Sequence, residues 1–260
     1  MKNVALITGA TGGLGREFVD LFARDGYNLL LTGRNEKKLS LIKKEAELTY
    51  GITAEVFPCD LAKSGAAEKI YSFAGEKQAE VTALVNNAGF GDFCEFYRES
   101  EEKLSDMVQV NAAVPVALTR LFLPAMVQRK SGVILNVASV AAFAPGPLMS
   151  VYYASKAFML SFSEGLHQEV KKYGVKVSAL CPGPTQTGFE SAADLEKSGL
   201  FKNLKIASAK KTAAYGYKKA EKGKAVAVHG FSNRFLTFLM KISPRALVRK
   251  CVYNIQKEKE

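Results

Sequence analysis

The stretch Val4-Ala5-Leu6-Ile7-Thr8-Gly9-Ala10-Thr11-Gly12-Gly13-Leu14-Gly15 decides the fold of this chain. Its apolar first half contains β-branched residues and predicts a strand that is buried on both faces. The glycines predict a tight turn, and Phe18, Leu21 and Phe22 then recur at helical spacing. A helix that begins at such a turn binds anions, because its free N–H groups and its dipole point at the bound group. Taken alone, the stretch also fits an ordinary strand-to-helix turn.

Length and composition favour one soluble α/β domain over residues 1–260. The first strand begins by residue 4, which leaves no room for a cleavable signal, and no apolar run approaches the ~20 residues that span a bilayer. The four cysteines are scattered, as expected in a reduced compartment, and two histidines make a metal site unexpected. We therefore expect a cytoplasmic protein without a metal.

The net charge of +11 is concentrated toward the end of the chain. Between Lys197 and Glu260, 16 Lys or Arg accompany only 3 Glu. A basic tail is compatible with nucleic acid or an anionic membrane, but a soluble basic surface is the commoner explanation. No nucleic-acid partner is expected.

Apolar runs alternate with helical patterns along the chain, which predicts a doubly wound parallel sheet of Rossmann type, with about seven strands and helices on both faces. In such an α/β fold, the ligand crevice lies at the carboxyl ends of the strands. The expected strands are 4–8, 28–32, 54–58, 83–86, 133–138, 176–181 and 224–229, and the expected helices are 14–24, 36–50, 65–76, about 101–129 and 152–173.

The residues after the second strand bear on the choice of cofactor. Gly33 stands where an acidic residue would bind the adenosine ribose, and Arg34 follows it. A guanidinium matches a phosphate, which favours the 2′-phosphate of NADP over NAD. The alternative is that Arg34 begins a solvated helix face.

Two further strand ends carry polar residues. Asp60-Leu61 follows the third strand, where the carboxylate can accept the adenine amino group or cap a helix. Asn86-Asn87-Ala88-Gly89 ends the fourth strand and can form the floor of a cofactor site or a turn.

Ser139 and the stretch Tyr152-Tyr153-Ala154-Ser155-Lys156 carry the chemistry. Ser139 ends the fifth strand, and Tyr152 and Lys156 share a helix face because they are four residues apart. The ammonium of Lys156 is expected to lower the pKa of Tyr152 and so favour proton transfer. Tyr153 has Ala157 at the same offset, so Tyr152 is the candidate acid.

In their order and spacing, these motifs resemble the short-chain dehydrogenase/reductase family in its single-domain form. The resemblance covers about 190 residues and rests on residues 8–15, Asn86-Asn87-Ala88-Gly89, Asn111, Ser139, Tyr152-Tyr153-Ala154-Ser155-Lys156 and Pro182-Gly183-Pro184-Thr185-Gln186-Thr187.

The resemblance implies roles for a catalytic set. Tyr152 would be the general acid/base, Lys156 would lower its pKa and bind the nicotinamide ribose, Ser139 would orient the substrate carbonyl, and Asn111 would hold a proton-relaying water. The expected cofactor is NADP, with NADPH preferred over NADH. Its predicted contacts are Gly9, Thr11, Gly13, Leu14, Gly15, Arg34, Asp60, Leu61, Asn87, Ala88, Gly89, Tyr152, Lys156, Pro182, Gly183, Thr185 and Thr187.

The resemblance implies a small-molecule carbonyl or alcohol substrate. Residues 188–222 correspond to the family's variable substrate loop and its following helix. Apolar side chains near the motifs suggest an apolar or aromatic ketone or aldehyde, although core packing explains several of them equally well. These side chains are Phe90, Phe93, Phe96, Tyr97, Phe143, Leu148 and Met149.

Residues 231–260 form a C-terminal extension with two predicted amphipathic helices, the second starting with Ser243 as N-cap and Pro244 at its first position. Their apolar faces are expected to cover the chain's own domain, a second subunit or a membrane interface, in that order. The tail also makes a homodimer more expected than the tetramer common in the family.

The sequence is compatible with three alternative functions. The first is an NADPH-dependent carbonyl reductase, the second a non-catalytic NADP-binding sensor or scaffold, and the third a peripheral membrane-associated or nucleic-acid-binding protein. The complete set Asn111, Ser139, Tyr152 and Lys156 favours the first.

Overall fold

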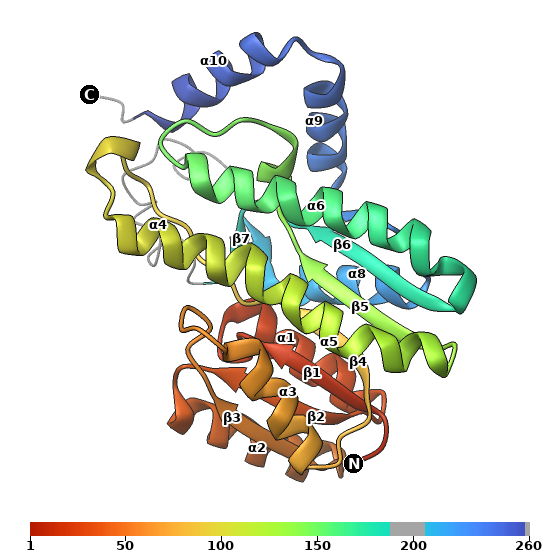
Figure 1. Cartoon of the computed structure of the whole chain (residues 1–260). Helices are drawn as coiled ribbons and strands as arrows, with labels where there is room; N and C mark the ends of the chain where they lie inside the picture. Colours follow the sequence, from red (N-terminus) through yellow and green to blue (C-terminus); the bar gives the residue numbers. More distant parts are fainter. Residues whose placement is uncertain (188–205, 258–260) are drawn as a thin grey trace.

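A parallel sheet forms the centre of the molecule in the computed structural model, which describes residues 1–187 and 206–257 (Figure 1). In the described residues its strand order is β3-β2-β1-β4-β5-β6-β9, which confirms the predicted doubly wound sheet of seven strands. The strands are β1 (Val4–Thr8), β2 (Asn28–Gly33), β3 (Ala54–Pro58), β4 (Val81–Asn86), β5 (Gly132–Val137), β6 (Val175–Cys181) and β9 (Val226–Val228).

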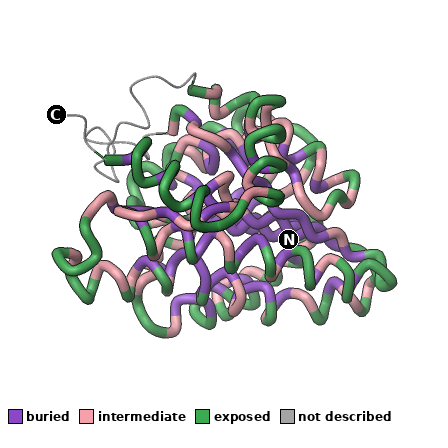
Figure 2. Tube along the Cα trace, turned by 90° about the horizontal axis from the view of Figure 1, so that it is seen from above, coloured by how far each residue is buried: buried purple, intermediate pink, exposed green. Residues whose placement is uncertain are grey.

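Apolar side chains point alternately to the two faces along each strand, which explains why helices cover both faces of the sheet. In β1, Ala5 and Ile7 pack into one apolar cluster while Val4 and Leu6 pack into another. Figure 2 shows the buried strands between helical layers whose outer sides are exposed. The first cluster includes α1 (Gly13–Arg24), α2 (Glu36–Tyr50) and α8 (Ala209–Glu221), and the second includes α3 (Ala66–Glu76), α5 (Val114–Gln128) and α6 (Ser150–Val170).

The strand order reverses at β1, which pairs with β2 on one side and with β4 on the other. At this point the connections leave in opposite directions, so a crevice opens beyond the carboxyl ends of β1 and β4. Shorter elements surround it: η1 (Phe96–Arg98), α4 (Glu101–Val108), η3 (Val140–Phe143), and the two-residue strands β7 (Thr185–Gln186) and β8 (Ala207–Ser208).

The helix predicted over 101–129 contains a π-helical turn, η2 (Gln109–Ala113), between α4 and α5. By length and composition alone, the run Glu101–Gln128 contains a window that is apolar enough to cross a membrane, contrary to the expectation from the sequence. Half of its most apolar window is buried, however, and α5 packs on the sheet through Leu118 and Met126. Burial against the sheet accounts for its apolar character.

Two helices, α9 (Phe231–Ile242) and α10 (Arg245–Gln256), follow the last strand and lie at one end of the molecule (Figure 1). The N-cap predicted for α10, Ser243, is wrong by one residue. Pro244 is the N-cap, and its carbonyl accepts hydrogen bonds from the N–H groups of Leu247 and Val248. In the region 188–222, which was predicted to contain the substrate loop, residues 188–205 lie outside the described residues, and α8 covers the sheet beside α1. At its C-terminal end, α6 continues directly into the short helix η4 (Lys171–Tyr173).

Candidate active site

The glycine turn after β1 brings three backbone segments into close contact. Gly9 has φ +65°, and a Cβ there would lie 2.9 Å from the Cα of Ala88. A Cβ on Gly13 would lie 2.7 Å from the Cα of Thr187, and one on Gly15 would overlap the carbonyl oxygen of Gly9. Only glycine fits these positions, so the turn stays narrow and the first N–H groups of α1 point into the crevice.

Thr8 and Asn87 hold this turn against the end of β4. The Thr8 hydroxyl accepts from the N–H groups of Asn87 and Ala88, both at 3.0 Å. The Asn87 side-chain amide donates to the carbonyls of Thr8, at 2.9 Å, and Gly9, at 3.1 Å. The predicted floor of the site is therefore also the clamp that fixes the turn.

A groove of about 720 Å³ runs over the carboxyl ends of the strands. Its volume and its glycine-lined wall fit a dinucleotide, whose diphosphate needs close backbone approach at a helix N-terminus. The predicted residues that line it are Gly9, Thr11, Gly13, Leu14, Arg34, Asp60, Leu61, Asn87, Ala88, Gly89, Ser139, Tyr152, Lys156, Pro182, Gly183, Thr185 and Thr187.

Gly15 and Asn111 are the predicted residues that do not line this groove in the described part of the chain. Gly15 lies behind the turn, where it permits the contact with Gly9. Asn111 belongs to the π-helical turn and is buried, with its amide bound to both backbone groups of Phe90 and, at 3.1 Å, to the Ser155 hydroxyl. It borders the groove through Gly89, since a Cβ there would lie 3.0 Å from Asn111 Oδ1 and 3.2 Å from Lys156 Nζ.

Arg34 and Asp60 lie at the far end of the groove from Tyr152. Arg34 follows β2 directly, is exposed and lines the groove, so its guanidinium can reach a bound anion. The neighbouring Arg16 instead pairs with Asp20 and Glu45, which neutralise its charge. Asp60 accepts from the N–H of Ala62 at 3.1 Å while it lines the groove.

Ser139, Tyr152 and Lys156 meet at the other end of the groove. Ser139 follows β5, and its hydroxyl hydrogen-bonds the phenol of Tyr152 in the first turn of α6. Lys156 Nζ donates to the Val137 carbonyl at 2.9 Å and lies 5.7 Å from the centre of the Tyr152 ring. The predicted i, i+4 pair therefore shares one helix face beside the end of β5.

The expected direction of the Tyr152 pKa shift is wrong. Burial raises the pKa of Tyr152 to about 12, and the hydrogen bond from Ser139 opposes this rise only in part. Burial also lowers the pKa of Lys156 to about 8. The cause is the same in both residues, because the Tyr152 phenolate and the Lys156 ammonium each lose hydration. Tyr152 is thus protonated at neutral pH and has a proton to donate.

Four of the residues that line the groove follow β6: Pro182, Gly183, Thr185 and Thr187. The Thr185 hydroxyl donates to the Gly183 carbonyl at 2.8 Å, and the Thr187 hydroxyl donates to the Thr185 carbonyl at 3.2 Å. These bonds keep the segment compact where it touches Gly13.

The apolar residues predicted near the substrate separate into several environments. Phe90 and Met149 line the groove, and Phe96 and Leu148 line a small cavity that also borders Tyr152. Tyr97 is exposed. Phe93 and Phe143 pack partly buried against apolar clusters.

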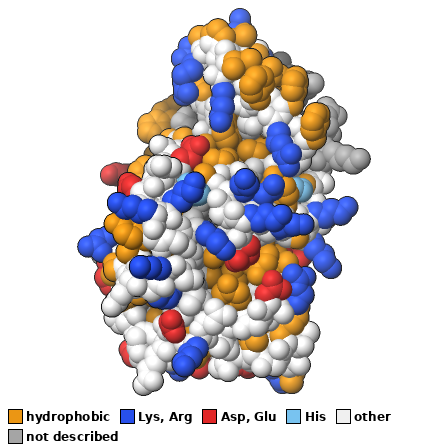
Figure 3. Space-filling model, turned by 90° about the vertical axis from the view of Figure 1, so that its right-hand side faces the viewer, with side chains coloured by type: hydrophobic (Ala, Val, Ile, Leu, Met, Phe, Trp, Pro, Cys, Tyr) orange, Lys and Arg blue, Asp and Glu red, His pale blue; other side chains and the backbone are white. Residues whose placement is uncertain are grey.

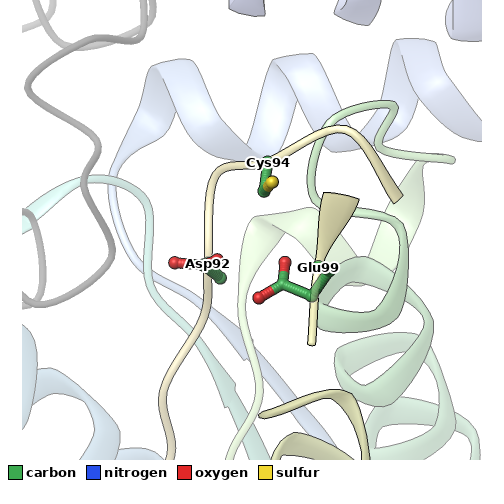
Figure 4. Close-up of side chains that lie close together, drawn as sticks. All are labelled: Asp92, Cys94 and Glu99. Atoms are coloured by element: carbon green, nitrogen blue, oxygen red, sulfur yellow. The ribbon is translucent and has the colours of Figure 1, made fainter. Parts of the chain in front are cut away.

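A second polar cluster beside this site was not predicted from the sequence. Asp92, Cys94 and Glu99 point toward one another (Figure 4), and their potential ligand atoms lie within 4.8 Å. The Lys103 ammonium is 2.6 Å from Asp92 and already supplies the positive charge there. Burial and the adjacent Asp92 raise the pKa of Glu99 to about 7, so the two carboxyl groups share a proton as well as the ammonium. The acidic pair therefore does not require a metal.

Comparison with known proteins identifies the family of this chain. The sequence profile of the short chain dehydrogenase family matches residues 3–198. Very-long-chain 3-oxoacyl-CoA reductase of Laccaria bicolor is 38% identical over 180 residues, which are 68% of this chain and 53% of that protein. The inactive hydroxysteroid dehydrogenase-like protein 1 of Homo sapiens is 34% identical over 182 residues, or 68% of this chain and 54% of that protein. The chain spans about half the length of these curated relatives.

A solved structure supports the same assignment. The short-chain dehydrogenase from Sphingobium yanoikuyae in complex with NADPH superimposes with a TM-score of 0.82 at 25% identity, over 94% of this chain and 96% of that one. The family profile, the curated relatives and the structural neighbour agree with one another on the family of this chain. This chain belongs to the short-chain dehydrogenase/reductase family.

Proposed function

We propose that the chain is an NADPH-dependent reductase that acts on a ketone carried by a long apolar chain, of the 3-oxoacyl thioester class. The observation that carries this proposal is the hydrogen bond between Ser139 and Tyr152 beside Lys156, at one end of a groove that fits a dinucleotide. When bound, the nicotinamide would supply the hydride. The protein supplies position, a proton and a dry environment.

Each catalytic side chain has one task in this proposal. The Ser139 hydroxyl donates to the substrate carbonyl oxygen and orients it, and the Tyr152 phenol donates its proton to that oxygen as it gains charge. Lys156, fixed by the Val137 carbonyl, places its ammonium beside Tyr152, and this ammonium would bind the ribose of the cofactor. Asn111 holds the backbone around Phe90 and, through a water, is proposed to connect Lys156 to bulk solvent.

The substrate class rests on the relatives and on the apolar walls of the site. Several relatives that are 30–38% identical are named very-long-chain 3-oxoacyl-CoA reductases. Phe90 and Met149 provide apolar surface in the groove near Tyr152. Among the apolar and aromatic ketones suggested by the sequence, we therefore propose a flexible acyl chain.

The preference for NADPH rests on Arg34, which lines the groove where β2 ends. Its guanidinium can form paired hydrogen bonds to a 2′-phosphate, and Gly33 offers no carboxylate to bind a free 2′-hydroxyl. The NADPH complex of a structural neighbour supports the same choice.

A chain-length series tests the proposal. Purified protein is mixed with NADPH and 3-oxoacyl thioesters of short, medium and long acyl chains, and loss of NADPH absorbance is followed. We expect kcat/KM to rise with chain length, because each buried methylene adds up to about 0.8 kcal/mol. An aromatic ketone panel serves as the comparison, and faster turnover of that panel would contradict the acyl-chain assignment.

One observation supports the non-catalytic alternative: the human relative is named as an inactive hydroxysteroid dehydrogenase-like protein. NADPH binding without turnover of any carbonyl in the series would favour it. A cytoplasmic location and a homodimer stay predictions.

A further inference from the structure

The two tail helices present opposite faces to different environments. Met240, Val248 and Val252 pack against a cluster that contains Tyr153 and Met149, and Gln256 Nε2 donates to the Tyr153 hydroxyl at 2.8 Å. Thr237 and Gln256 are buried as well. This inner face fixes α9 and α10 to the wall of the site, beside the candidate acid.

The outer face of α9 is apolar and exposed. Phe231, Phe235, Phe238 and Ile242 are 86%, 58%, 56% and 63% exposed. Their spacing of four, three and four residues aligns them in one stripe along the helix. Figure 3 shows hydrophobic side chains gathered at the end of the molecule that α9 and α10 form. So large an exposed apolar patch marks an interaction surface.

The charges that the two tail helices themselves carry have one sign. Residues 231–257 contain no Asp or Glu, and their basic residues are Arg234, Lys241, Arg245, Arg249, Lys250 and Lys257. A second copy of the chain docked face to face would bring these positive charges together, which opposes self-association. An anionic surface would complement them.

We propose that the outer face of α9 and the adjoining basic residues of α10 bind the surface of an anionic lipid bilayer. The aromatic stripe inserts among the lipid headgroups while Lys and Arg contact phosphate and carboxylate groups. The helices lie in the interface and do not cross the bilayer. This surface rests on the contacts and charges of the tail and does not depend on the proposed reductase activity.

The chain has no Trp, so one introduced Trp reports on a single position. The full-length Phe238→Trp variant is mixed with vesicles of phosphatidylcholine alone or of phosphatidylcholine with phosphatidylserine. We expect a blue-shifted emission and quenching by brominated lipid only with the anionic vesicles, weakening as salt rises. Leu48→Trp, at a position 77% exposed on α2, is the matched control and should not shift. Equal shifts in the two variants, or none in either, would overturn the proposal.

Cosedimentation with the same vesicles tests the two components of the surface. Phe235→Asp combined with Phe238→Asp should lower the bound fraction at least about tenfold, since burial of two Phe side chains is lost. Leu41→Asp with Leu48→Asp, both exposed on α2, should bind as the unmodified chain does. Arg249→Gln with Lys250→Gln should weaken binding to anionic vesicles more than Lys171→Gln with Lys172→Gln.

Light scattering without lipid tests whether a second copy of the chain, rather than a bilayer, covers the stripe. NADPH binding is measured for every variant to check that it folds. A dimer that the Phe235→Asp, Phe238→Asp variant converts to monomer, with no vesicle binding by the unmodified chain, would mean that a second copy covers the stripe. A variant pair that binds NADPH normally and still cosediments fully would also overturn the membrane assignment.

Discussion

Gln256, in the last turn of α10, donates a 2.8 Å hydrogen bond to the hydroxyl of Tyr153, 103 residues earlier in the chain. Tyr153 follows the candidate acid Tyr152, and the two rings make an edge contact with centroids 6.1 Å apart. The C-terminal helix therefore supports the helix turn that carries the proposed chemistry.

Loss of this bond should reduce stability. Tyr153→Phe leaves the buried Gln256 amide without this acceptor, so we expect the free energy of unfolding to fall by about 1–3 kcal/mol in urea denaturation. Tyr253→Phe removes a hydroxyl from a tyrosine that is 46% exposed on α10 and should change stability little. Equal effects of the two substitutions would contradict a special role for the Gln256 contact.

The glycine turn offers a matched pair of substitutions. Gly13→Ala places a methyl 2.7 Å from the Cα of Thr187, whereas Gly12→Ala places one 3.5 Å from the Gly9 carbonyl, an ordinary contact. Overpacking should cost about 1–3 kcal/mol and widen the groove at Gly13 only. NADPH titration should show a loss of about one decade in affinity for Gly13→Ala and little for Gly12→Ala. Comparable losses would indicate that the turn is not closed against Thr187.

Cofactor preference should depend on Arg34. Removing a hydrogen bond to a charged group costs about 1.5–3 kcal/mol, so Arg34→Ala should lower NADPH affinity by one to two decades and leave NADH affinity nearly unchanged. Lys37→Ala, exposed on α2 and outside the groove, is the control. Equal losses of affinity for NADPH and NADH would mean that Arg34 stabilises the fold or contacts the diphosphate, which both cofactors share.

The shared proton of Asp92 and Glu99 predicts a pH dependence of stability. Burial raises the pKa of Glu99 to about 7, so the folded state holds a proton that the unfolded chain releases near its ordinary value of about 4.5. This contribution is complete below pH ~4.5 and is lost as pH rises through 7. Lys103 and Asp92 face the group, and the lowered pKa of Asp92 acts only at more acidic pH.

Glu99→Gln tests that assignment because the amide imitates the protonated carboxyl group. Between pH 5 and about 7.5, the unfolding free energy should decline more steeply in the unmodified protein than in this variant. If urea denaturation gives the same dependence of the unfolding free energy on pH for both proteins, Glu99 ionises at its ordinary pKa and the assignment is wrong.

The sheet and the ends of the groove were predictable because local patterns determine them. The glycine turn follows a buried strand, and Tyr152 and Lys156 share a face through their i, i+4 spacing. Each of these relationships lies within a few residues in the sequence. The position of Ser139 after β5 was predicted as well, whereas its hydrogen bond to Tyr152 was not.

Long-range packing explains what the sequence did not predict. The π-helical turn that carries Asn111 has no pattern of its own, and the Gln256–Tyr153 and Asp92–Glu99 pairs depend on how distant or irregular segments fold together. The sign of the Tyr152 pKa shift was missed because it depends on burial, which the i, i+4 spacing does not reveal.

Turnover by a Tyr152→Phe variant tests the central claim most directly. A 3-oxoacyl thioester and NADPH are supplied at saturation, with Tyr253→Phe, at a position 46% exposed on α10, as the control and NADPH affinity measured for both. We expect kcat to fall by about 10²–10⁴ in Tyr152→Phe with NADPH affinity retained, because the general acid is lost while the groove is intact. The control should keep turnover. A Tyr152→Phe protein that retains most of its activity would contradict the account.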